Sequence, residues 1–284
     1  MDYYQLKREM EGRLEPDYGA GEAKAMVRLI LHHLKGWDQT QLMIHGDETV
    51  SDAMLRKAGE ILDRLERHEP LQYILGEARF YGMDLTVNRS VLIPRPETEE
   101  LVDIIVRENP GDDLRVLDVG TGSGAIAIAL SRNLPFSQIT AIDFSEGALA
   151  VARENATRLH ADVKFVLRDI FRYEPQPESF DIIVSNPPYI VESERKSMDA
   201  NVLDYEPESA LFVPDSHPLL FYSRIAEVAL KGLASGGRLY FEINPLFAAD
   251  LKKMLQREGF DDVTIAKDIS GRERFASAVK GNNN

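Results

Sequence analysis

The sequence predicts an α/β protein in which a small all-α bundle precedes a doubly wound domain. Three observations support this fold class. The N-terminal quarter has only helical periodicity, the remainder alternates short β-rich runs with helical ones, and a glycine-rich turn follows the first of those runs. Strands that alternate with helices form a parallel sheet with crossover connections, so the second part is expected to be doubly wound.

Length and composition indicate a folded protein of two domains. The chain has 284 residues, of which 44% are hydrophobic and 28% charged, which is ordinary for globular proteins. No apolar run approaches the roughly 18 residues of a membrane span, and residues 1–10 are too polar for a signal peptide. The absence of cysteine excludes disulfides, thiolate zinc sites and a cysteine nucleophile. We therefore expect a cytoplasmic protein with no membrane contact.

The charge balance argues against a partner made of nucleic acid. Asp and Glu number 47 and Lys and Arg 33, which gives a net charge of -14. Such a chain repels phosphate backbones unless its basic residues are segregated on one face, and the sequence contains no Lys/Arg cluster. We expect no direct nucleic-acid binding, and no metal site is predicted.

Residues 1–71 are expected to form the helical bundle. Apolar residues recur at helical spacing in Tyr4–Leu14, in Met26–Leu34 and after Ser51, a predicted N-cap whose helix Pro70 closes. Glycines separate the first two helices. His32 and His33 are interpreted as residues of the helix packing or the helix surface rather than as ligands.

A change of period marks the start of the second domain. Apolar residues nearly alternate around Gly82, which predicts a β-hairpin linker over residues 72–91. Residues 92–280 then form the α/β domain, with helices after Ser123 and Ser145, and residues 281–284 are expected to be a disordered tail. The predicted strands are Val116–Val119, Ile139–Ile142, Val163–Leu167, Asp181–Val184, Arg238–Ile243 and Arg274–Val279.

The glycine-rich turn predicts a nucleotide-like ligand. Strand 116–119 runs into Gly120, Thr121, Gly122, Ser123 and Gly124 and then into a helix, so a ligand can touch backbone and a helix N-terminus. Asp143 ends the next strand, where its carboxylate can accept hydrogen bonds from both hydroxyls of a ribose. The alternative is a glycine turn that serves only strand–helix packing.

The turn alone leaves the ligand open between two classes. Gly120, Gly122 and Ala125 satisfy the pattern of dinucleotide-binding enzymes, so an NAD-dependent oxidoreductase is an alternative. Asp118 favours S-adenosylmethionine instead, because a carboxylate there would repel a pyrophosphate but attract an ammonium group. Asp169 and Ile170, after another strand, are candidates for the adenine amino group and the adenine ring.

The segment Ser185-Asn186-Pro187-Pro188-Tyr189 is predicted to carry the chemistry. Two prolines fix the backbone and remove two N–H donors, which leaves rigid carbonyls beside the Asn186 amide. If the Asn186 oxygen and the Pro187 carbonyl each accept one hydrogen of a planar NH2 group, its nitrogen faces a methyl sulfonium. Tyr189 can then stack on the planar group. The proton can leave late, so no strong base is needed.

These motifs resemble those of the class I methyltransferases with an Asn-Pro-Pro-Tyr signature. More closely, the chain is similar to the HemK family, the glutamine N5-methyltransferases of peptide chain release factors. The segments that carry the resemblance are Leu71-Gln72-Tyr73-Ile74-Leu75-Gly76, Phe80-Tyr81-Gly82, Leu92-Ile93-Pro94-Arg95-Pro96-Glu97-Thr98-Glu99, the glycine turn, Asn186–Tyr189, Glu206-Pro207 with Ala210-Leu211, and Gly271-Arg272.

The resemblance implies a seven-stranded, Rossmann-like methyltransferase domain, a linker hairpin, and a helical domain that helps to hold the release factor. It implies S-adenosylmethionine as cofactor, S-adenosylhomocysteine as product, and methylation of the glutamine in the Gly-Gly-Gln loop. Residues 120–124, Asp143, Asp169, Ile170 and Asn186 would bind the cofactor, and residues 186–189 would bind the glutamine. Several relatives have tryptophan at the position of Ile170.

Three alternatives remain on the sequence alone. A nucleobase amino-methyltransferase would use the same pocket, but it must extrude a base and grip phosphates, and the charge does not support that. An NAD dehydrogenase lacks a recognisable hydride-transfer site here. A binding module without catalysis would leave residues 186–189 unexplained.

Overall fold

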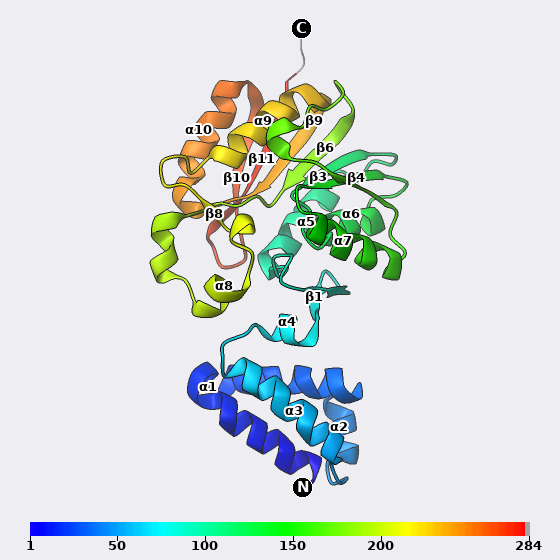
Figure 1. The fold of residues 1–284 in the computed structure, drawn as a ribbon. Helices are drawn as coiled ribbons and strands as arrows, with labels where there is room; N and C mark the ends of the chain where they lie inside the picture. The colour runs from blue at the N-terminus through cyan, green and yellow to red at the C-terminus, as the bar shows by residue number, and fades with distance from the viewer. Residues whose placement is uncertain (282–284) are drawn as a thin grey trace. The chain divides into compact units, whose positions relative to one another are not determined.

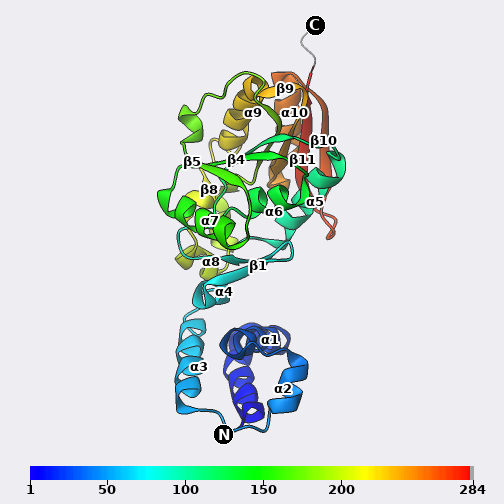
Figure 2. The ribbon, with the colours of Figure 1, turned by 90° about the vertical axis from the view of Figure 1, so that its right-hand side faces the viewer.

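The computed structural model describes residues 1–281 and divides into two compact units (Figures 1 and 2). Unit 1 comprises Met1–Gly76 together with Asp199–Tyr205, and unit 2 comprises Glu77–Met198 together with the chain from Glu206 onward. Of the predicted tail, residues 282–284 lie outside the described residues.

Unit 1 is a helical bundle. Its helices are α1 (Tyr3–Lys35), α2 (Gln39–His45), α3 (Asp52–Leu65), α4 (Leu71–Leu75) and, from the distant segment, α8 (Ala200–Tyr205). The two predicted N-terminal helices are the arms of α1, which is interrupted at Gly19, where φ is 76° and ψ is 156°. Ser51 caps α3 as predicted, because its hydroxyl oxygen accepts from the Met54 amide. Pro70 stands beyond the end of α3, at the N-cap of α4.

A tight hairpin opens unit 2. Strands β1 (Glu77–Phe80) and β2 (Met83–Thr86) are antiparallel, with Phe80 opposite Met83. The two turn residues, Tyr81 and Gly82, have φ values of 46° and 75°. Positive φ at both central positions is the type I′ geometry that matches strand twist, so the hairpin predicted around Gly82 is present. Residues 72–75, expected in the hairpin linker, are helical in α4, which ends in a left-handed C-cap at Gly76 before the hairpin begins.

The centre of unit 2 is a seven-stranded sheet in the order β10-β11-β9-β6-β3-β4-β5. All six predicted strands are present, and β10 is the one the pattern missed. The strands are β3 (Arg115–Val119), β4 (Gln138–Asp143), β5 (Val163–Leu167), β6 (Phe180–Ser185), β9 (Leu233–Glu242), β10 (Phe260–Lys267) and β11 (Glu273–Lys280), and a separate pair is β7 (Ile190–Val191) with β8 (Phe212–Val213).

The expectation of an all-parallel sheet is wrong at one strand. Strands β5, β4, β3, β6 and β9 are parallel, whereas β11 is antiparallel to both β9 and β10. Only residues 268–272 connect β10 to β11, and so short a connection allows a hairpin but not a crossover. The sheet is therefore mixed.

Helices cover both faces of the sheet. The helices of unit 2 are α5 (Pro96–Glu108), α6 (Ala125–Asn133), α7 (Glu146–Arg158), α9 (Leu220–Gly232) and α10 (Ala248–Glu258), with short 3-10 turns at Ile170–Arg172, Glu192–Ser197, Glu208–Ala210 and Pro245–Phe247.

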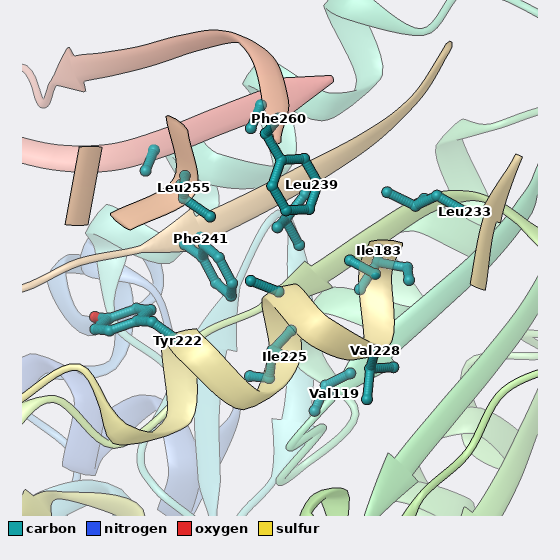
Figure 3. Packing of buried hydrophobic residues seen from close by; sticks show 14 of the residues in the cluster. Val119, Ile183, Tyr222, Ile225, Val228, Leu233, Leu239, Phe241, Leu255 and Phe260 are labelled. Atoms are coloured by element: carbon teal, nitrogen blue, oxygen red, sulfur yellow. The ribbon is translucent and has the colours of Figure 1, made fainter. Parts of the chain in front are cut away.

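Successive residues of β6 show how the sheet is buried from two sides. Ile183 packs with α9 and α10, whereas Ile182 and Val184 pack with α5 and α6. Figure 3 shows the first cluster, in which Tyr222 and Ile225 of α9 face the sheet beside Phe241. Burial on both faces explains why these strands are continuous apolar runs in the sequence.

Candidate functional site

A cavity of about 740 Å³ lies within unit 2, where the parallel strands end. Gly120 follows β3, Asp143 ends β4, Asp169 follows β5 and Asn186 follows β6, and all four residues line it. Ligands of open α/β sheets bind outside the carboxyl ends of the strands, so this is the expected position for a site. The sequence-predicted residues in its lining are Gly120, Thr121, Gly122, Ser123, Asp143, Asp169, Ile170, Asn186, Pro187 and Pro188.

The glycine turn is held open on the cavity side. Gly120 and Gly122 have φ values of 73° and 55°, and a Cβ on either would meet no protein atom within 4 Å. Backbone conformation rather than packing therefore requires glycine at these positions, and the space beside them is available to a ligand. The amides of Gly120 and Thr121 donate to the Ile142 carbonyl, which ties the turn to β4.

Gly124 has a different role from the other glycines. It is the N-cap of α6, does not line the cavity, and has a φ of 82°. A Cβ there would lie 3.0 Å from Ile128 Cδ1 and 3.2 Å from Ala152 Cβ. Gly124 thus permits close packing of α6 and α7 and is not at the ligand surface.

Asp118 does not face the cavity, which corrects the charge argument made for it. Its side chain is fully buried, and its Oδ2 accepts from the Thr121 hydroxyl at 2.6 Å. Burial, with a smaller contribution from the negative charge of Asp143, raises the pKa of Asp118 to about 7. Asp118 fastens the glycine turn through Thr121, and its other oxygen, Oδ1, is buried without a hydrogen-bond partner among residues 1–281.

Asp143 lies in the cavity wall with its carboxylate already anchored. Oδ2 accepts from the Gly122 amide and Oδ1 from the Ser145 amide, both at 2.9 Å. Burial raises the pKa of Asp143, and these amide hydrogen bonds oppose the rise. Each oxygen keeps a second lone pair, so the anchored carboxylate can still accept from a ribose hydroxyl.

The region after β5 offers an apolar wall that sequence reasoning only partly found. Asp169 caps the 3-10 turn by accepting from the Phe171 amide at 2.9 Å, and Ile170 lines the cavity. Phe144 and Phe171 also line it, although they are 60% and 43% exposed. Phe171 packs on Phe221, with ring centroids 5.2 Å apart. Exposed phenylalanines beside a cavity can cover a planar ring, and the available signal was their position shortly after the ends of β4 and β5.

Asn186, Pro187 and Pro188 line the cavity, but Tyr189 does not. The Tyr189 hydroxyl donates to Glu242 Oε1 at 3.0 Å, and burial raises the Tyr189 pKa above its ordinary value. The hydroxyl is thus directed at a buried carboxylate, and stacking of the Tyr189 ring on the acceptor stays a prediction.

Several residues of the site come from distant parts of the chain and were not identified as functional. Arg95 and Thr98, in the segment noted for its resemblance, both line the cavity, as does Phe212. Arg95 donates to the buried Glu206 at 2.5 Å, and the Ile93 amide donates to the same carboxylate at 3.2 Å. Glu206 therefore fastens residues 93–95 beside the cavity.

The residues present fit S-adenosylmethionine. The cavity brings together an open glycine turn, an anchored carboxylate for ribose hydroxyls, and apolar side chains for a ring. Among residues 1–281, no group of three or more His, Cys, Asp or Glu side chains could hold a metal ion. Within the same residues, no helix has the length and apolar character needed to cross a membrane.

Comparisons with known proteins agree with this geometry. Residues 110–265 match the family described as a methyltransferase domain, and residues 5–76 match the PrmC N-terminal domain. A methyltransferase structure from Pyrococcus furiosus has a TM-score of 0.53 at 18% identity, covering 79% of this chain and 100% of that one, which shows the fold alone.

Two relatives extend over almost the whole chain. A release factor glutamine methyltransferase of Bacteroides thetaiotaomicron is 48% identical over 266 residues, which are 93% of this chain and 95% of that protein. One of Flavobacterium psychrophilum is 42% identical over 258 residues, or 89% of this chain and 90% of that protein. The chain therefore belongs to the release factor glutamine methyltransferases, enzymes that depend on S-adenosylmethionine.

Proposed function

We propose that this chain transfers a methyl group from S-adenosylmethionine to the side-chain amide nitrogen, N5, of the Gly-Gly-Gln glutamine in peptide chain release factors. One observation carries the proposal: Asn186, Pro187 and Pro188 line the same cavity as the glycine turn and Asp143. Donor and acceptor groups would therefore meet in one cavity. The relatives named above support the choice of a release factor as the substrate.

The donor side is assigned to the turn and the strand ends. Gly120, Thr121, Gly122 and Ser123 would hold the donor through backbone, and Asp143 would accept from its ribose. Asp169 and Ile170, with the nearby phenylalanines, would surround the adenine. Bound S-adenosylmethionine supplies a methyl group on a sulfonium sulfur and leaves as S-adenosylhomocysteine. Gly124 supports this side only through packing.

The acceptor side is assigned to Asn186 and Pro187. An amide nitrogen is a poor nucleophile because its lone pair is delocalised, so its orientation decides the rate. The Asn186 side-chain oxygen and the Pro187 carbonyl would accept its two hydrogens. As the new C–N bond forms and the C–S bond breaks, positive charge grows on the nitrogen and both acceptors stabilise it. One proton then leaves the nitrogen.

The N-terminal helical domain is proposed to select the release factor. A glutamine side chain offers few contacts, so choosing one glutamine among many requires surface beyond the pocket. The match of residues 5–76 to a domain named for this family supports this role. The net charge of -14 supports a protein partner rather than nucleic acid. We place the reaction in the cytoplasm, where release factors act.

The test is methylation of a purified release factor, read by mass spectrometry of the peptide that contains the Gly-Gly-Gln sequence. We expect one methyl group on the glutamine, and S-adenosylhomocysteine but not NAD should bind in calorimetry. Asn186→Ala should lower turnover by about 10²-fold or more, since one preorganised acceptor is worth about 3 kcal/mol in a transition state. Its donor affinity should stay within a few-fold. Near-normal turnover of Asn186→Ala would remove the acceptor role.

A further inference from the structure

A chain of two hydrogen bonds runs from Asn186 through Thr98 to a buried carboxylate, which also accepts a third bond from Tyr189. Asn186 Nδ2 donates to Thr98 Oγ1 at 3.3 Å, and the Thr98 hydroxyl donates to Glu242 Oε2 at 2.6 Å. The Tyr189 hydroxyl donates to the other oxygen, Oε1, at 3.0 Å. Thr98 and Glu242 are 4% and 1% exposed, so the bond between them is shielded from water.

When Glu242 is ionised, its carboxylate gives the chain of bonds a direction. A carboxylate only accepts, so it takes the single hydroxyl proton of Thr98. Thr98 Oγ1 can then only accept from Asn186, and the NH2 end of the amide is the end that can donate to it. The side-chain oxygen of Asn186 is thereby left for another donor.

We propose that Thr98 and Glu242 are positioning residues that fix the Asn186 side chain with its amide oxygen toward the acceptor glutamine. The proposal rests on the proposed function. In the opposite orientation, the NH2 of Asn186 would face the NH2 of the acceptor, and neither group could accept. Tyr189 belongs to the same arrangement, because its hydroxyl holds the second oxygen of Glu242.

The orientation of the Asn186 amide depends on whether Glu242 is ionised. Burial raises the pKa of Glu242, while the hydroxyls of Thr98 and Tyr189 and the charge of Arg274 oppose that rise. A neutral group at this position can donate to Thr98. The Thr98 hydroxyl could then donate to the Asn186 oxygen, which would select the wrong orientation.

Four variants test the positioning role. Thr98→Val removes the hydroxyl but keeps nearly the same shape, and Thr98→Ser keeps the hydroxyl. Glu242→Gln keeps the size of the side chain but supplies a donor, and the fourth variant combines Thr98→Val with Glu242→Gln. We expect kcat to fall about tenfold or more in Thr98→Val and in Glu242→Gln, because small misplacement of a reacting group is costly. S-adenosylhomocysteine affinity should stay within about twofold, since neither side chain is hydrogen-bonded to the glycine turn or to Asp143.

Rescue and coupling separate positioning from general damage. Thr98→Ser should recover most of the lost kcat, and the double variant should be little slower than the slower single variant, because both changes break one chain. The matched controls are Thr157→Val, which removes an exposed hydroxyl bonded to the Arg153 carbonyl, and Tyr240→Phe, which removes a buried hydroxyl bonded to Glu108. Both controls should turn over within about twofold of the parent.

A second readout does not depend on turnover. In a 15N-labelled chain, the side-chain NH2 signal of Asn186, identified by its loss in Asn186→Ala, should shift in Thr98→Val and return in Thr98→Ser. An unchanged signal, or a Thr98→Val variant with parental kcat, would overturn the positioning role. If the parent chain methylates no release factor while the NH2 signal behaves as expected, the proposed function fails and the positioning of Asn186 stands.

Discussion

At the scale of single residues, Asp143 is the sharpest test of the donor site. Its carboxylate is held by the amides of Gly122 and Ser145 before any ligand arrives, so its contact with a ribose would be a ground-state interaction. Asp143→Ala should therefore weaken S-adenosylmethionine binding about tenfold or more, as expected for hydrogen bonds to a charged group. Calorimetry with S-adenosylhomocysteine measures the change.

The control for Asp143→Ala is thermal unfolding, because the variant also leaves two amides without their acceptor. A folded variant that binds the donor like the parent would show that Asp143 does not hold the ribose. A variant whose acceptor KM rises while donor affinity is constant would place it on the other side of the cavity.

The buried carboxyl of Asp118 makes the stability of the protein depend on pH. The folded protein raises its pKa from an ordinary value near 4 to about 7. The folded state therefore binds this proton more tightly than the unfolded chain does. The resulting stabilisation is fully present below about pH 4 and is lost as pH rises through about 7.

Asp118→Asn removes this titration and keeps an oxygen that can accept from Thr121. The unfolding free energy of the variant minus that of the parent should be roughly 1–3 kcal/mol larger at pH 8 than at pH 5. Urea unfolding at both pH values measures the difference, and Asp112→Asn, at an exposed position, is the control. An equal difference at pH 5 and pH 8 would contradict the raised pKa.

At the scale of elements, the sequence pattern predicts the buried central strands and misses an edge strand that is half exposed. Strands β3 and β4 are largely buried on both faces and rich in Val, Ile and Leu, so their runs are unambiguous. Strand β10 lies at the edge of the sheet, carries exposed Asp261 and Asp262, and has a register shift between Asp261 and Thr264. These features break the two-residue period, so no pattern reveals the strand. The placement of β11 between β9 and β10 is a property of topology that periodicity does not contain.

The site divides in the same way. Gly120, Asp143 and Asn186 each follow a strand and belong to recognisable local patterns, so their positions were predictable. Thr98 and Glu242 meet although they are 144 residues apart in the chain, and neither belongs to a local pattern that indicates the contact. Asp118 and Gly124 were assigned to the ligand from the motif alone. Neither lines the cavity, and the structure shows Asp118 fastening the turn and Gly124 in close packing.

At the scale of the whole molecule, the chain passes between the two units three times, after Gly76, after Met198 and after Tyr205. Residues 199–205 belong to unit 1, where the Tyr205 hydroxyl donates to the Arg67 carbonyl at 2.9 Å. Pro207, two residues later, lines the cavity of unit 2. If unit 1 binds the release factor, the binding domain includes residues 199–205, which directly precede a cavity-lining segment in the sequence.

This organisation makes removal of the N-terminal helices the test of substrate selection. We expect a chain that begins at Glu77 to bind S-adenosylhomocysteine normally, because every residue of the cavity lies beyond that point. Its kcat/KM on intact release factor should fall about tenfold or more, which corresponds to the loss of 1.4 kcal/mol or more of transition-state binding.

The truncation also leaves residues 199–205 without the helices they pack with, so damage to the cavity must be separated from lost recognition. A short Gly-Gly-Gln peptide makes this distinction, because it reaches the cavity without needing the body of the factor. If recognition alone is lost, the full-length and truncated chains should methylate the peptide at the same slow rate, and circular dichroism should show a folded truncated chain. A peptide rate that falls with the factor rate would indicate a damaged cavity. A folded truncated chain that methylates the intact factor at the parental rate would show that the helical domain only stabilises the fold.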